Sequence, residues 1–332
     1  MTDKKSIQTI YMDYLKYIVS FALILAVGMI YEKYKHGLIN DEDKRNYEMV
    51  SKYLVNESSL AKSKLPIIWI HLDYEYNSRW WPSFASRGTN ELNQPYLFLT
   101  IKSIIDRCGG DFNICLIDDN SFENIVPGWN IDMTRVADPI KSKLRELAMA
   151  RLLKHYGGLI VPPSFVCTKN LADMYYSLTC QGKPFVAELL DRNSTSDKID
   201  YYPSSKFMGC AKECMIIEEY VSYLEKMIST DYTAESVFLG SQDRWLYAKI
   251  QNGMINLVPA NVLGVEDAEG KPVLIERLMG NSYIDFIPTT LGVVLPDTEI
   301  LKRNKFEWFA RLSVRQALDC DNIAGKLLLT CR

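Results

Sequence analysis

Hydrophobic and polar positions change period several times along the chain, and these changes predict alternating strands and helices. Residues 66–71 and 112–117 are compact apolar runs, which are typical of buried strands. Residues 96–108 instead place apolar side chains at helical spacing on one face. A short helix is predicted over residues 121–126. The order strand, helix, strand, helix predicts a mainly parallel α/β sheet flanked by helices.

A longer amphipathic segment follows, and both of its ends carry boundary signals. Asp138 and Pro139 suit a helix start, because Asp can cap the first turn and Pro fits into it. The helix is predicted over residues 140–155 and ends at Gly157 and Gly158, since glycine tolerates the left-handed backbone. Further elements are predicted as strands at residues 159–161, 185–190, 255–258 and 292–295 and as helices at residues 213–228, 238–250 and 305–318.

The N-terminal region has the composition of a membrane anchor. Residues 14–31 carry a single charge, at Lys16, and tyrosines including Tyr14 and Tyr31 bracket the run as interfacial aromatic residues do. A bilayer core takes about 20 apolar residues of helix, so the run is sufficient. The sequence therefore predicts a tail over residues 1–13, one transmembrane helix in the lipid bilayer over 14–31, a polar stalk over 32–64 and a globular domain over 65–332.

Charge and cysteine content narrow the classes of partner. The chain has 38 basic and 41 acidic residues, so it lacks the basic balance that nucleic acid binding requires. Its eight cysteines mostly have apolar neighbours, as reduced core cysteines do. Lys and Arg are more frequent just after the predicted span than before it, which favours a cytosolic C-terminal domain on a single-pass membrane protein.

The most informative motif is the predicted central helix followed by Tyr156-Gly157-Gly158 and a short apolar strand. This combination resembles the sugar-nucleotide site of GT-A glycosyltransferases, in the branch that includes capsular polysaccharide synthesis proteins. The resemblance covers roughly residues 65–175 and implies a GT-A-like fold. It also implies an Asp-x-Asp metal site after the strand, but Pro162 and Ser164 occupy the two carboxylate positions.

The same resemblance identifies the residues that would contact a nucleotide-sugar. They are Glu146, Tyr156, Gly157, Gly158 and Ser164. In the central helix the family has an Asp and an Arg that face the donor. Glu146 keeps the acid at the first position, and Met149 stands at the second. Losing both metal aspartates and this arginine removes most of the charge compensation for the diphosphate leaving group, so no metal ligands are predicted.

Three other carboxylates are candidates for catalysis. Asp118 and Asp119 follow the second predicted strand, where ligands bind in open α/β sheets. The alternative is that these residues form a turn and a helix cap. Asp243 could act as a base from a later helix, with a solvated helix residue as the alternative.

The sequence leaves two functions open. The first is a membrane-anchored, non-catalytic structural or binding module with a degenerate metal site and no cofactor. The second is an active, metal-independent glycosyltransferase. A conventional, metal-dependent glycosyltransferase would instead use Mn²⁺ or Mg²⁺ together with a nucleotide-sugar. Segments such as residues 117–122, 127–130 and 161–165 also resemble anchored glycosyltransferase-like proteins of large DNA viruses. That resemblance implies a virion setting, with a capsid or other membrane proteins as partners.

Overall fold

A computed structural model describes residues 65–72, 94–189, 203–230, 238 and 240–331 of the 332-residue chain. The predicted membrane span, the stalk and the polar loop after residue 72 lie outside the described residues. No helix within the described ranges is both long and apolar enough to cross a membrane. All described elements belong to one of the chain's two compact units, from Tyr53 to Arg332.

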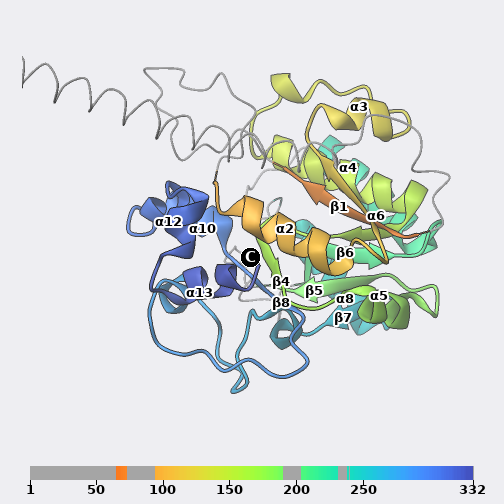
Figure 1. Ribbon diagram of the computed structural model, residues 1–332. Coiled ribbons are helices and arrows are strands. Elements are labelled where there is room, and N and C mark those ends of the chain that lie inside the picture. The colour runs from red at the N-terminus through yellow and green to blue at the C-terminus, as the bar shows by residue number, and fades with distance from the viewer. Residues whose placement is uncertain (1–64, 73–93, 190–202, 231–237, 239, 332) are drawn as a thin grey trace, which may run out of the picture. The chain divides into compact units, whose positions relative to one another are not determined.

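A six-stranded sheet forms the centre of the domain and confirms the mainly parallel α/β prediction (Figure 1). Its order is β2-β1-β3-β6-β5-β7. Strand β6 runs antiparallel to both of its neighbours, whereas the β1–β2, β1–β3 and β5–β7 pairs are parallel. The strands are β1 (Ile67–His71), β2 (Asn113–Ile117), β3 (Gly158–Ile160), β5 (Phe185–Glu188), β6 (Pro203–Cys210) and β7 (Asn256–Val258).

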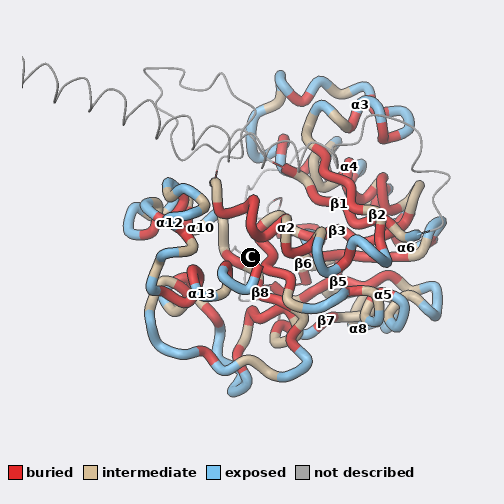
Figure 2. The backbone as a smooth tube through the Cα atoms, in the orientation of Figure 1, coloured by how far each residue is buried: buried red, intermediate tan, exposed pale blue. Residues whose placement is uncertain are grey.

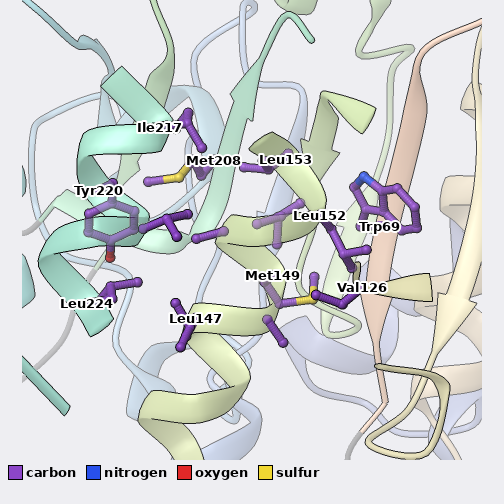
Figure 3. Close-up of a cluster of buried hydrophobic side chains, with 14 of the residues drawn as sticks. Trp69, Val126, Leu147, Met149, Leu152, Leu153, Met208, Ile217, Tyr220 and Leu224 are labelled. Carbon is purple, nitrogen blue, oxygen red and sulfur yellow. The ribbon is translucent and has the colours of Figure 1, made fainter. Parts of the chain in front are cut away.

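Alternating side chains of the central strands separate the two faces of the sheet. Ile67 and Trp69 of β1 join the core cluster beneath α4 and α6, and Ile68 and Ile70 are buried on the opposite face. Figure 3 shows α4 side chains such as Leu152 between the sheet and α6, and Figure 2 shows the strands largely buried. The helices of this part are α2 (Leu97–Cys108), α3 (Ser121–Ile125), η2 (Met133–Arg135), α4 (Ile140–Tyr156), α5 (Ala172–Thr179), α6 (Met215–Ser229) and α8 (Ser241–Gln251).

A second, two-stranded sheet and several short C-terminal helices complete the described part of the domain. Strand β4 (Phe165–Cys167) pairs antiparallel with β8 (Gly292–Val294) and lies against α2. The remaining elements are η3 (Ala260–Leu263), α9 (Ile275–Leu278), α10 (Asp297–Lys302), α11 (Glu307–Ala310), α12 (Val314–Leu318) and α13 (Ile323–Leu329).

The prediction of one helix over residues 305–318 is wrong, because this stretch forms α11 and α12 with a break between them. Ser313 is the cause of the break. Its backbone is extended, its hydroxyl accepts the Gln316 N–H, and the Gln316 side chain bonds back to the Ser313 N–H. This reciprocal capping box starts a new helix where the apolar periodicity alone predicts continuity.

Candidate functional site

The Tyr-Gly-Gly turn after α4 is built into the packing of the domain. Gly157 and Gly158 have φ values of +69° and +102°, which glycine adopts readily, but the ψ of −160° at Gly157 differs from the left-handed helical conformation that the sequence predicts. The Trp69 indole donates to the Gly157 carbonyl at 3.0 Å. The Tyr156 hydroxyl donates to the Ile125 carbonyl at 3.0 Å, and its ring lies 5.7 Å from that of Trp69. The hydroxyl of Tyr156 and the carbonyl of Gly157 are thus engaged inside the fold.

The turn also lies at the opposite edge of the sheet from Asp118 and Asp119. Gly158 begins β3 beside Ile67, the first residue of β1. His71 ends β1 opposite Ile117, the last residue of β2, and Asp118 follows directly. These parallel strands are five residues long, so roughly 15 Å separates the two edges. The Tyr-Gly-Gly turn and the two aspartates therefore do not converge on one point.

The positions that would carry the Asp-x-Asp carboxylates follow β3. The residues found there do not form a metal site. Pro162 has no side-chain ligand, and Ser164 is 1% exposed. The Ser164 carbonyl accepts the Leu295 N–H at 3.0 Å, and the adjacent Pro163 carbonyl accepts the Thr100 hydroxyl. Because Mg²⁺ and Mn²⁺ require several oxygen ligands, these residues do not fit a divalent cation. Nowhere in the described ranges do three or more His, Cys, Asp or Glu side chains group closely enough to hold one.

Asp118 forms a local turn, which was the alternative to a catalytic role for Asp118 and Asp119. Its Oδ1 accepts the Ser121 N–H at 2.8 Å and the Ser121 hydroxyl at 2.6 Å. The Ser121 hydroxyl also lies 3.2 Å from the Asp118 N–H. This reciprocal pattern fixes the start of α3.

Asp119 has a different environment, at the centre of a half-buried group of charges that we call the Asp119 cluster. Arg145 of α4 grips the carboxylate with two hydrogen bonds, from Nε to Oδ1 at 2.8 Å and from Nη2 to Oδ2 at 2.6 Å. Lys141, one turn earlier, lies 3.8 Å from Oδ2. His71 Nε2 lies 3.0 Å from Oδ1, and its ring stacks on Phe122. Two cations and a histidine therefore surround one carboxylate.

Burial and charge act in opposite directions on Asp119. Burial raises the pKa of the carboxyl, but the hydrogen bonds and positive charges of His71 and Arg145 outweigh it and hold the pKa well below its usual range. The Lys141 and Arg145 side chains are 5% and 12% exposed. Arg145 is therefore not on a solvated face of α4. His71 is a partly buried histidine at the end of β1 that is hydrogen-bonded to Asp119.

Glu146 belongs to a second polar group on the other side of α4. Its Oε1 accepts the hydroxyls of Tyr220 at 2.5 Å and Ser205 at 2.6 Å, and its Oε2 lies 3.3 Å from Lys143 Nζ. Burial first, and then the negative charge of Glu146, raise the pKa of Tyr220 well above its usual value. Met149, at the position of the family's arginine, is buried with Val126 in the apolar core (Figure 3).

Asp243 lies near this second group, because its charge also raises the pKa of Tyr220. It is buried in α8, so the prediction of a solvated helix residue is wrong. The three candidate carboxylates are thus divided between a turn, the Asp119 cluster and the Tyr220 side of α4. The structure does not bring them together as one catalytic group.

The contribution of Lys141 and Arg145 was missed from the sequence, although two signals for it exist. His71 and Asp119 follow the ends of adjacent parallel strands, which places them at one edge of the sheet. Lys141 and Arg145 are spaced i, i+4 and therefore share one face of α4. In comparisons with known proteins, no protein-family model, curated protein or solved structure matches this chain.

Proposed function

We propose that residues 65–332 form a GT-A-like domain without a catalytic metal site, and that this domain acts as a non-catalytic binding or structural module. Residues 14–31 tether it to a membrane. The resemblance of the Tyr-Gly-Gly region and the mainly parallel sheet support the fold part of the proposal. The resemblance to viral proteins supports a virion membrane, with a capsid as the neighbouring partner.

The proposal rests mainly on the contacts that the Asp119 carboxylate makes. Both of its oxygens are occupied by Arg145, Lys141 and His71. To bind a metal, the carboxylate would have to give up its two hydrogen bonds from Arg145 and its contact with Lys141, and breaking a buried ion pair costs about 3–5 kcal/mol. The positions after β3 add no carboxylate that could share the metal. The residues present thus favour a structural ion cluster over a catalytic site.

A thermal-shift titration with UDP- and GDP-sugars, with and without Mn²⁺, tests this function. We expect no change in melting temperature with any donor. A ligand at 100 times its Kd would stabilise the folded state by about 2.7 kcal/mol, which corresponds to several degrees for a domain of this size. Stabilisation that requires Mn²⁺ would contradict the proposal. Stabilisation by a donor without Mn²⁺ would show a donor site, and transfer or hydrolysis of that donor would then favour the metal-independent glycosyltransferase instead.

The membrane tether makes a separate prediction. Removing residues 1–35 should release a folded domain that stays monodisperse without detergent, because the removed segment contains the apolar run. The full chain should require detergent or lipid. Size-exclusion chromatography and circular dichroism of the two chains measure this. Aggregation of the shortened chain would instead indicate that residues 14–31 belong to the core of the protein.

A further inference from the structure

The C-terminal helices carry several exposed cations before and after an exposed tryptophan in the sequence. Lys302 ends α10, Lys305 precedes α11, and Arg311 and Arg315 lie after α11 and in α12. All four are exposed, as is Trp308 at 45%. Helices α10 and α11 pack together, and exposed backbone surrounds α12 (Figure 2). We call these five residues the C-terminal basic surface.

This surface is opposite in sign to the remainder of the chain. Residues 297–318, from the start of α10 to the end of α12, contain five basic and three acidic residues, for a net charge of +2. The whole chain carries −3, so the rest sums to −5. A basic segment on an otherwise acidic protein points to an anionic partner at that segment rather than to general attraction of polyanions.

Part of this charge is not neutralised within the protein. Arg311 forms an ion pair with Glu307, four residues earlier. Within the described ranges, Lys302, Lys305 and Arg315 form no ion pair. Lys305 instead lies over the Phe306 ring at 5.3 Å. Three exposed cations are therefore available to an external anion.

Trp308 determines which kind of anionic partner fits best. Its ring packs edge-on against Phe309, which is fully buried, so the indole is fixed to the core while remaining half exposed. An exposed tryptophan in a segment rich in Lys and Arg matches the interface of a bilayer, where indoles lie at headgroup level and cations contact phosphate and carboxylate groups.

We propose that the C-terminal basic surface docks on the anionic headgroups of the membrane that holds the anchor. The inference rests on the membrane tether in the proposed function. Each Lys or Arg near an anionic surface contributes about 1 kcal/mol, so the three free cations shift the ratio of docked to undocked domain by roughly 100-fold. Docking would fix the orientation of the domain relative to the bilayer.

Hydrogen exchange of the full chain in vesicles tests the proposal. The chain is reconstituted in phosphatidylcholine alone and in phosphatidylcholine with about 30% phosphatidylserine, which mimics a charged leaflet. We expect amides of residues 302–318 to exchange more slowly in the anionic vesicles, and the difference to disappear at high salt because screening shortens the range of the attraction. Equal exchange in the two vesicles would overturn the proposal.

Two matched triple variants distinguish the effect of cations on this surface from the effect of cations elsewhere on the protein. Lys302→Gln, Lys305→Gln and Arg315→Gln together should abolish the difference between the vesicles. Lys206→Gln, Lys212→Gln and Lys226→Gln remove the same charge from other exposed positions and should leave it unchanged. Loss of the difference in both variants would contradict the proposal. Flotation of the chain with neutral vesicles reports the anchor independently, so a failed tether and a failed docking surface are distinguishable.

Discussion

Gly158→Ala should be the most destabilising single substitution to alanine on the Tyr-Gly-Gly turn. Gly158 has a φ of +102°, and a Cβ there would lie 2.2 Å from the Ile67 carbonyl oxygen. That oxygen belongs to β1, which is bonded on both sides within the sheet. Neither backbone can move away without opening the β1–β3 pair. We expect the free energy of unfolding to fall by about 4 kcal/mol or more.

Gly182 offers a matched control for this substitution. Its φ is +71°, yet nothing lies within 4 Å of the position that an added Cβ would take. Gly182→Ala should therefore cost about 1 kcal/mol, from backbone conformation alone. Urea unfolding of the chain without residues 1–35, followed by circular dichroism, measures both variants. Equal losses at the two positions would show that the contact with Ile67 is not the cause.

The elements with strong local patterns were predictable from the sequence, and those that depend on the rest of the fold were not. Strands β1 and β2 have compact apolar runs, and helix α4 is bounded by Pro139 and Gly157. Strand β6 was missed, because its first half, Pro-Ser-Ser-Lys, is polar and only its second half is buried. Its strand conformation comes from pairing with β3 and β5, which no local pattern encodes.

The candidate site shows the same division. The sequence showed that two carboxylates follow β2, but it did not predict the different roles of Asp118 and Asp119. Asp118 bonds three residues ahead, which is a local interaction. Asp119 bonds Arg145, which is 26 residues away and reaches it because α4 packs across the sheet edge. The resemblance placed Glu146 at a donor site, whereas packing of α4 on α6 directs it to Tyr220.

Asp119→Asn should cost about 3 kcal/mol of stability, because it removes the buried charge that Arg145 and Lys141 contact in the folded protein. Asp118→Asn should cost about 1 kcal/mol or less, since its turn bonds are local and half exposed. Urea unfolding of both variants near neutral pH measures the difference. A stable Asp119→Asn protein would mean that the cluster does not hold the domain together.

The pH dependence of stability should identify the same carboxylate. Since the pKa of Asp119 is depressed in the folded state, its contribution is complete above the unfolded-state pKa of about 3.9 and is lost as pH falls through the lower folded value. The natural chain should therefore lose stability steeply below about pH 4, and Asp119→Asn should lose less over that window.

A double variant completes this argument, because it separates an ion cluster from a catalytic group. If Asp119 acts by compensating Arg145, removing both partners through Asp119→Asn and Arg145→Gln should cost less than the sum of the two single losses. We expect the coupling to be about 1–3 kcal/mol. Additive losses would show that the pair observed in the structure contributes little, and the carboxylate would again be available as a catalytic candidate.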